Sequence, residues 1–298
     1  MIIVKLQGGL GNQLYEYALY EKLRTLGRKV LLDDIDYTDR AFLRDIREIE
    51  LGKFKGLDLK YCSLRQHYAM VDDKRTVPAR LRRKLFGSHG KVVRETAEYM
   101  PEIFEKDNVY LDGFWQCQKY YEDILPLLRN NLSFAGGYNS ECAEMLGRIK
   151  ENPYSTSIHI RLGDYVAKAS TYGGIATIDY YRSAIQYLKN KGKEVSLYLF
   201  SDDLKGAGRI LNEYGISYTP VECNSGDDSI YDMMLMANCK NNICANSSFS
   251  IWGATLNGYE DKMMIRPLKS NNDSDTDPKL MKELWTGWTI IDEKGTVI

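Results

Sequence analysis

The stretch SIHIRLGDYV, residues 157–166, indicates the fold class of this chain. It begins as a short buried strand and then turns through a Gly-Asp pair. Side chains of a strand alternate between its two faces, so Ile158 and Ile160 point one way while His159 and Arg161 point the other. The two isoleucines are typical of a core. We expect His159 and Arg161 to face a polar group, and Arg161 indicates that this group is anionic.

Strand and helix patterns alternate on both sides of this stretch. From residue 151 onward, apolar strands and amphipathic helices follow one another, and residues 2–34 form a strand–helix–strand unit around a glycine loop at 8–13. This alternation predicts parallel sheets, and 298 residues suit two domains. We therefore expect two Rossmann-like α/β domains, residues 1–150 and 151–298, with parallel sheets facing each other across a cleft.

The composition excludes several classes of protein. The formal net charge is -1, so no overall positive field would attract nucleic acid. The six cysteines form no CxxC pair, and the three histidines form no HExxH motif. The apolar run at 2–6 is too short for a signal peptide, and no stretch is long enough to span a bilayer. We expect a cytoplasmic protein that binds no nucleic acid.

The glycine loop allows two interpretations. Gly9-x-Gly11 follows a strand, and Asp33 comes some twenty residues later, as in a dinucleotide-binding fingerprint. Leu14 occupies the third glycine position of that motif, which makes an NAD-dependent oxidoreductase the weaker alternative. Asn12 and its neighbouring glutamine at the helix start favour recognition of phosphate or of sugar hydroxyls.

A second group of polar residues follows the strands of the second half. Asp202 ends one strand, and CANSSFS at 244–250 leads from another strand into a helix. Ser247 or Ser248 has a simpler interpretation as a helix N-cap. Free N–H groups and hydroxyls at a helix start also bind anions. Because parallel strands end at one edge of a sheet, we expect Arg161, Asp202 and Ser248 to converge.

Two further patterns have simple explanations. Asp34-x-Asp36 has the spacing of the metal-binding acidic pair of many sugar transferases, but a turn at the strand end explains it as well, and we expect no metal requirement. The basic stretch 74–94 carries Leu81, Leu85 and Phe86 among its charges. A solvated segment explains this stretch best. Weak peripheral contact with the inner face of the cytoplasmic membrane is the alternative.

Six segments resemble the bacterial α-1,2-fucosyltransferases of glycosyltransferase family 11. They span residues 7 to about 257 and are, in order, QGGLGNQLYEYA, LDGFWQCQKYY, HIRLGDY, DYYRSAIQYL, FSDD and NSSFSIWGATLN. The resemblance implies a two-domain GT-B fold and GDP-L-fucose as the donor. It also implies transfer with inversion to the 2-hydroxyl of a terminal galactoside, in the synthesis of a bacterial surface polysaccharide or O-antigen. The acceptor would be a galactose-terminated glycan or a lipid-linked oligosaccharide.

The resemblance also implies roles for individual residues. Arg161 would hold the β-phosphate of the donor, His159 would lie against guanosine, Asp232 would pair with guanine, and Ser248 would bind phosphate. The complete set of expected donor-binding residues is Gly9, Gly11, Asn12, His159, Arg161, Asp202, Asp232, Asn246, Ser247, Ser248 and Phe249.

Two positions depart from the family pattern. Leu162 replaces a second arginine, and Ile251 replaces the first residue of a double tryptophan. These departures indicate, as alternatives, an unusual acceptor or another GDP-deoxysugar as the donor. A non-catalytic sugar-nucleotide-binding protein is a further alternative.

Asp164 joins Arg161 as a catalytic candidate. The general base stays open among Asp164, Asp34 and His159. One guanidinium and a helix start can stabilise a leaving diphosphate without a metal or other cofactor.

Overall fold

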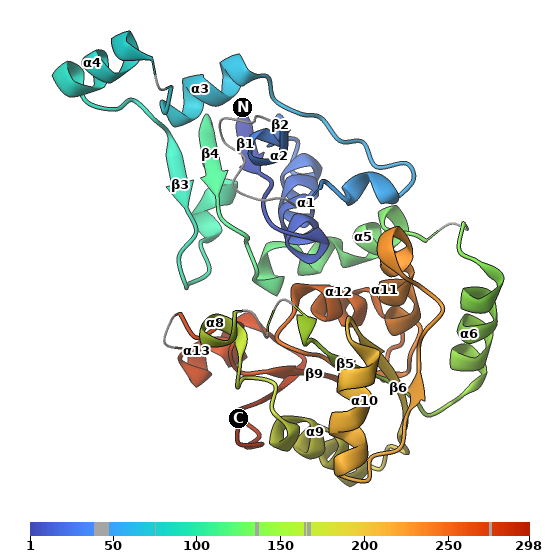
Figure 1. Cartoon of the computed structure of the whole chain (residues 1–298). Coiled ribbons are helices and arrows are strands. Elements are labelled where there is room, and N and C mark those ends of the chain that lie inside the picture. The colour runs from blue at the N-terminus through green and yellow to red at the C-terminus, as the bar shows by residue number, and fades with distance from the viewer. Residues whose placement is uncertain (39–47, 75, 135–136, 164, 166–167, 274–275) are drawn as a thin grey trace. The chain divides into compact units, whose positions relative to one another are not determined.

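The computed structural model describes residues 1–298 except 39–47, 75, 135–136, 164, 166–167 and 274–275. The chain forms two compact units, Met1–Ser133 and Phe134–Ile298 (Figure 1). The boundary between the units follows Ser133 and so comes earlier in the chain than the boundary after residue 150 that the sequence predicts. Helix α6 (Ser140–Glu151) explains the difference, because its Cys142, Met145 and Ile149 pack into a core cluster of the second unit.

The first unit is built on a four-stranded sheet in the order β2-β1-β4-β3. Its strands, all parallel, are β1 (Ile2–Lys5), β2 (Val30–Asp33), β3 (Val92–Arg94) and β4 (Val109–Asp112). Its helices are α1 (Leu10–Thr25), α2 (Ile35–Thr38), α3 (Leu64–Val71), α4 (Val77–Phe86) and α5 (Leu125–Asn131), with 3-10 turns η1 (Leu51–Lys53), η2 (Pro101–Phe104), η3 (Gln118–Tyr120) and η4 (Glu122–Ile124). Strand β1 lies inside the sheet, and its first three residues are fully buried, as an uninterrupted apolar run predicts for a parallel strand.

The glycine loop is shorter than the sequence pattern suggests. Helix α1 begins at Leu10 instead of Leu14, so only Gly8 and Gly9 make the turn and Gly11 lies within the helix. Gly8 has a φ of +74°, a conformation that favours glycine, and a Cβ there would lie 2.6 Å from Nδ2 of Asn12. The turn therefore needs its first glycine for a backbone reason that is independent of any ligand.

The sequence of residues 108–124 predicts an aromatic strand followed by a helix. The strand is present as β4, but no helix follows within this fully described segment, which instead forms the short turns η3 and η4. Trp115 adopts a φ of +57°, in the left-handed region, which interrupts any regular helix at that point.

The second unit contains a six-stranded parallel sheet in the order β10-β9-β8-β5-β6-β7. Its strands are β5 (Ser155–Ile160), β6 (Ser196–Ser201), β7 (Thr219–Pro220), β8 (Asn241–Ile243), β9 (Met264–Pro267) and β10 (Trp288–Ile291). Besides α6, its helices are α8 (Ala169–Tyr172), α9 (Ile178–Asn190), α10 (Leu204–Glu213), α11 (Ile230–Ala237), α12 (Ser248–Leu256) and α13 (Pro278–Leu284), with the 3-10 turn η5 (Gly226–Ser229). Together with the first sheet, this confirms the expected α/β class with two parallel sheets.

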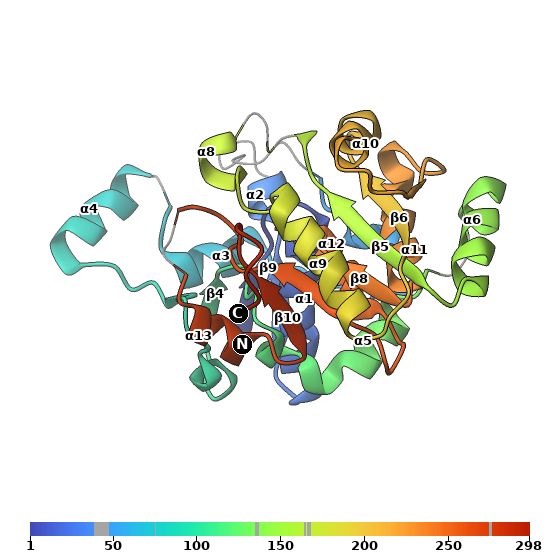
Figure 2. The same cartoon turned by 90° about the horizontal axis from the view of Figure 1, so that it is seen from below.

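Strand β5 shows the predicted alternation. Ile158 and Ile160 belong to a core cluster with residues of α9 and α10, whereas Phe200 of the neighbouring strand belongs to a cluster with residues of α6 and α11. Helices therefore cover both faces of the sheet, and Figure 2 shows α9 lying across the strands. Within the described ranges, no helix combines the length and the apolar character that crossing a bilayer requires.

Candidate functional site

The candidate site lies at the carboxyl edge of the second sheet. Strands β6, β5 and β8 are adjacent and parallel, so all three end at the same edge. The first residues beyond β5 and β6 are Arg161 and Asp202, and β8 leads through Asn246 into α12. This edge is where open α/β sheets bind ligands. The predicted convergence of these strand ends is thus present in the fold.

Arg161 and Asp202 form an ion pair. Nε of Arg161 lies 3.2 Å from Oδ2 of Asp202, and the arginine side chain is 33% exposed. The other carboxylate oxygen accepts a hydrogen bond from the backbone N–H of Leu162 at 2.9 Å. A Cβ at Gly163 would lie 2.2 Å from Oδ2, so this close approach requires glycine. Asp202 therefore fixes both the turn after β5 and the direction of the guanidinium.

Tyr165 connects the turn after β5 with the start of α12. Its hydroxyl donates to the backbone carbonyl of Asn246 at 2.8 Å, and its ring stacks on Tyr172 with centroids 4.6 Å apart. The guanidinium carbon of Arg161 lies 5.9 Å from the centroid of the Tyr165 ring. Asn246 in turn donates to the carbonyls of Tyr172 and Ser270 at 3.3 and 3.2 Å. Tyr165 was not among the residues expected at the site, although it lies within the segment 157–166.

The start of α12 carries no side-chain cap. Ser247 occupies the N-cap position, but its side chain makes no capping hydrogen bond within the described part of the chain. Ser247 is buried and Ser248 is half-buried. The first N–H groups of a helix have no partner inside the helix. This helix start therefore presents donors and a partial positive charge to an anion at the same edge as Arg161.

His159 is a buried, uncharged imidazole. His159 is only 4% exposed, and its Nδ1 has no hydrogen-bond partner among the described residues. Burial, and secondarily the positive charge of Arg161, lowers the pKa of His159 to about 3. Its ring centroid lies 6.2 Å from that of half-buried Phe249. A group with so low a pKa is a poor general base near neutral pH.

Asp232 lies on α11, which packs closely against α12. A Cβ at Gly253 of α12 would lie 2.8 Å from Cβ of Met236 on α11. Oδ1 of Asp232 accepts a hydrogen bond from the amide of Asn224 at 2.8 Å. Burial raises the pKa of Asp232 to about 7, against the smaller lowering effect of that hydrogen bond. Asn224 keeps its own Oδ1 buried and without a partner among the described residues.

Three further candidates lie in the first unit. Gly9 and Gly11 lie at the start of α1, in the first unit. Oδ1 of Asn12 accepts a hydrogen bond from the side-chain amide of Gln116 at 2.8 Å, also in that unit. Gln13 is fully buried and donates to the backbone carbonyl of Gly8 at 3.0 Å, which is a structural role. Asp164 lies outside the described residues.

Asp33, the acid that a dinucleotide fold would use, is buried and bonded on both oxygens. It is 2% exposed. Oδ2 lies 2.6 Å from Nδ1 of His67 and accepts from the hydroxyl of Tyr110 at 2.8 Å, while Oδ1 accepts from the N–H of Ile35 at 3.1 Å. An acid held in this way cannot present its oxygens to a ribose. The geometry therefore weighs against the oxidoreductase alternative.

A cavity of about 500 Å³ lies beside this buried acid. Burial raises the pKa of Asp34 in its wall. Asp36 pairs instead with Nζ of Lys5 at 3.0 Å. Among the described residues, no three His, Cys, Asp or Glu side chains gather as the ligands of a metal ion would. The cavity is lined by Asp33, Asp34, Ile35, Thr38, Cys62, Leu64 and His67.

Comparison with known proteins places the chain in a family. The family model described as Glycosyl transferase family 11 matches residues 92–291. The chain is similar to the O-antigen biosynthesis glycosyltransferase WbnK of Escherichia coli, with 32% identity over 94% of this chain and 98% of the relative. It is also similar to an alpha-1,2-colitosyltransferase of Escherichia coli, with 29% identity over 90% of this chain and 91% of the relative. A galactoside 2-alpha-L-fucosyltransferase of Caenorhabditis elegans is 26% identical over 92% of this chain and 74% of the relative. Since the family model matches more than half of the chain, this protein belongs to glycosyl transferase family 11.

Proposed function

We propose that this glycosyltransferase moves L-fucose, with inversion, from GDP-L-fucose to the 2-hydroxyl of a terminal galactoside in O-antigen synthesis. The observation that carries the proposal is the position of Arg161. Its guanidinium is held by Asp202 at the same sheet edge as the uncapped start of α12. The relatives, an O-antigen biosynthesis glycosyltransferase and a galactoside 2-alpha-L-fucosyltransferase, support the biological setting and the type of bond formed.

The chemistry requires stabilisation of a leaving diphosphate. Negative charge grows on the β-phosphate as the bond to the sugar breaks, and donors placed there in advance lower the barrier. Arg161 supplies a fixed cation, and the N–H groups and hydroxyls of Ser247 and Ser248 supply further donors. Asp202 acts as a positioning residue in this scheme, because its carboxylate fixes the guanidinium through Nε.

Recognition of the base rests on Asp232. An ionised carboxylate can accept from N1–H and from the 2-amino group of guanine together, a pattern that uracil and adenine lack. We assign guanine to Asp232 with Asn224 beside it, and the nucleoside to the neutral face formed by His159 and Phe249.

A second donor has specific support. The colitosyltransferase relative is named for a different deoxysugar, and Leu162 and Ile251 depart from the pattern of the fucosyltransferases. GDP linked to another deoxysugar, such as colitose, is therefore the alternative donor. A binding protein without turnover is a further alternative, which product formation would exclude.

The test is a transfer assay with the purified chain. GDP-L-fucose is offered with galactose-ended disaccharides, released GDP is measured, and the product linkage is determined by NMR. The proposal predicts GDP release that depends on the acceptor and an α-1,2 linkage. UDP-galactose serves as the donor control. Turnover of GDP-colitose but not of GDP-L-fucose would establish the alternative donor, and an absence of product from either would contradict the proposed reaction.

A further inference from the structure

Helix α4 of the first unit exposes apolar side chains. All ten residues of this helix are described, and none is buried. Val77 is 75% exposed, Leu81 55%, Leu85 64% and Phe86 82%. Figures 1 and 2 both show α4 extending away from the four-stranded sheet. Scattered exposed apolar residues are ordinary, but Val77, Leu81 and Leu85 recur every four residues on one face of this helix and form a patch.

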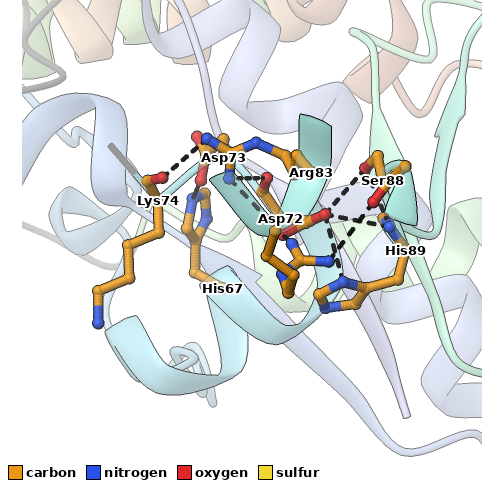
Figure 3. A network of polar contacts seen from close by, with 10 residues as sticks. His67, Asp72, Asp73, Lys74, Arg83, Ser88 and His89 are labelled. Atoms are coloured by element: carbon orange, nitrogen blue, oxygen red, sulfur yellow. Dashed lines mark hydrogen bonds and ion pairs between the residues drawn. The ribbon is translucent and has the colours of Figure 1, made fainter. Parts of the chain in front are cut away.

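The helix is held at its base by Asp72 (Figure 3). This residue has a φ of 58° directly after α3, and its carboxylate is paired with the guanidinium of Arg82. Its backbone carbonyl accepts from Arg83 at 2.8 Å. Its other carboxylate oxygen accepts from the hydroxyl of Ser88 at 3.1 Å and from the N–H of His89 at 3.0 Å. One buried acid thus ties the C-terminal half of α4, and the residues directly after it, to the end of α3.

These contacts set the orientation of the apolar residues. Successive residues of an α-helix are rotated by about 100°. Val77, Leu81 and Leu85 therefore form one stripe about 80° wide, and Arg83 lies about 160° from the middle of this stripe. Since Arg83 donates to the backbone carbonyl of Asp72 in the body of the unit, the apolar stripe faces away from it.

The charge around the stripe is uniformly positive. Residues 74–94 contain eight lysines and arginines and no acid, in a chain whose net charge is -1. Arg80 and Lys84 are exposed and lie along one side of the stripe on the helix wheel. A second copy of the chain on this face would bring like charges together, and a nucleic acid would leave the leucines in water. A bilayer with anionic headgroups satisfies both the cations and the apolar stripe.

We propose that α4 lies in the surface of an anionic bilayer, with Val77, Leu81 and Leu85 at the boundary between headgroups and acyl chains. Arg80 and Lys84 contact the headgroups, and Asp72 keeps the helix in the orientation that presents the stripe. This inference is independent of the transfer reaction. It replaces the solvated segment as the best explanation of residues 74–94.

The first test measures co-sedimentation of the full chain with vesicles of phosphatidylcholine containing about one third phosphatidylglycerol. We expect binding that falls with added salt and is absent with phosphatidylcholine alone. Leu81→Gln with Leu85→Gln should weaken binding about tenfold or more, and Arg80→Gln with Lys84→Gln should do the same by removing headgroup contacts. The matched controls are Leu26→Gln with Leu127→Gln and Lys189→Gln with Lys205→Gln, at exposed positions outside α4.

The second test places a reporter in the stripe. Leu85→Trp should shift its fluorescence to shorter wavelength when anionic vesicles are added, whereas Leu26→Trp should not, because only the former enters an apolar environment. The inference is overturned if neither variant pair in α4 weakens binding more than its control, or if the Leu85→Trp emission is unchanged by saturating anionic vesicles. Self-association through α4 without lipid, measured by ultracentrifugation, would also overturn it in favour of a dimer.

Discussion

The two sheets have the same parallel design but use their carboxyl edges differently. In the first unit, the charged residue at the end of β2 is Asp33, which is buried and bonded to His67, Tyr110 and a backbone N–H. In the second unit, Arg161 follows β5, remains one-third exposed, and is oriented by Asp202. A charge surrounded by partners stabilises a fold, whereas a charge that is oriented and accessible can meet a ligand. We therefore expect contacts at the first edge to contribute mainly to stability and Arg161 at the second edge to contribute to the proposed reaction.

The largest effect, a loss of stability, should follow from removing the buried carboxylate of Asp33 at the first edge. Asp33→Ala removes the partner of His67, Tyr110 and the N–H of Ile35 together. Loss of one member of a buried ion pair costs about 3–5 kcal/mol. We expect urea unfolding to detect a loss of this size, with Asp34→Ala as the neighbouring control that changes little.

Binding of GDP to the Asp33→Ala protein that stays folded should be unchanged, as measured by calorimetry below the unfolding transition. If Asp33→Ala kept its full stability but bound GDP more weakly, Asp33 would instead have a role in nucleotide binding.

The next effect tests the second edge. Arg161→Ala should lower turnover by about a hundredfold to a thousandfold, because stabilisation of the leaving diphosphate is lost. Arg161→Lys should restore only part of the rate, since an ammonium keeps the charge but not the planar geometry. Initial rates and melting temperatures are measured on the same preparations. Arg209→Ala, at an exposed position of α10, is the control.

The opposite pattern would return Arg161 to a structural role. In that case Arg161→Ala would melt at a lower temperature while the folded molecules kept nearly the wild-type rate.

A smaller effect concerns pH and Asp232. Its pKa is raised to about 7, so the carboxyl is protonated below that pH and ionised above it. Guanine offers two donors to this group, and only the ionised carboxylate accepts both. We expect GDP affinity to be constant above pH 7 and to fall about tenfold per unit below it. Titration calorimetry from pH 5.5 to 8.5 measures this dependence.

Asp232→Asn should bind GDP weakly and lose the pH dependence, because the amide neither titrates nor accepts at both atoms. UDP, which lacks the two donors, should show no such dependence in the wild type. A wild-type GDP affinity that is flat through pH 7 would remove Asp232 from guanine recognition.

The sequence predicted local features well and distant partners poorly. The alternation in β5 and the helix start after β8 follow from short-range rules, so Ile158, His159 and Ser247 lie where expected. The convergence of Arg161 and Asp202 at one sheet edge followed from the strand pattern, but their ion pair did not, because it depends on how β5 and β6, 41 residues apart at these positions, are aligned. The contact of Tyr165 with Asn246 spans 81 residues and depends on the conformation of two loops.

The first unit was the harder one to predict for the same reason. His67 meets Asp33 across 34 residues, from helix α3 within residues 35–130, whose sequence pattern is less regular than that of the second half. The sequence placed Asp33 at a strand end but could not reveal that its oxygens are already bonded.

The smallest expected effect is that of metal chelation. It tests whether the acidic residues of the first edge take part in the reaction. Asp34-x-Asp36 has the spacing of a metal-binding pair, but Asp36 lies 3.0 Å from Nζ of Lys5, so an ammonium already occupies the place of a cation. In the proposed reaction, Arg161 and the start of α12 supply the positive potential instead. Turnover should therefore change less than twofold when EDTA is added. The first edge would have a catalytic role if EDTA abolished activity and Mn²⁺ restored it in the wild type but not in Asp36→Asn. Lys5→Met is the second variant, because it removes the ammonium that pairs with Asp36. We expect its turnover to stay insensitive to EDTA and to Mn²⁺.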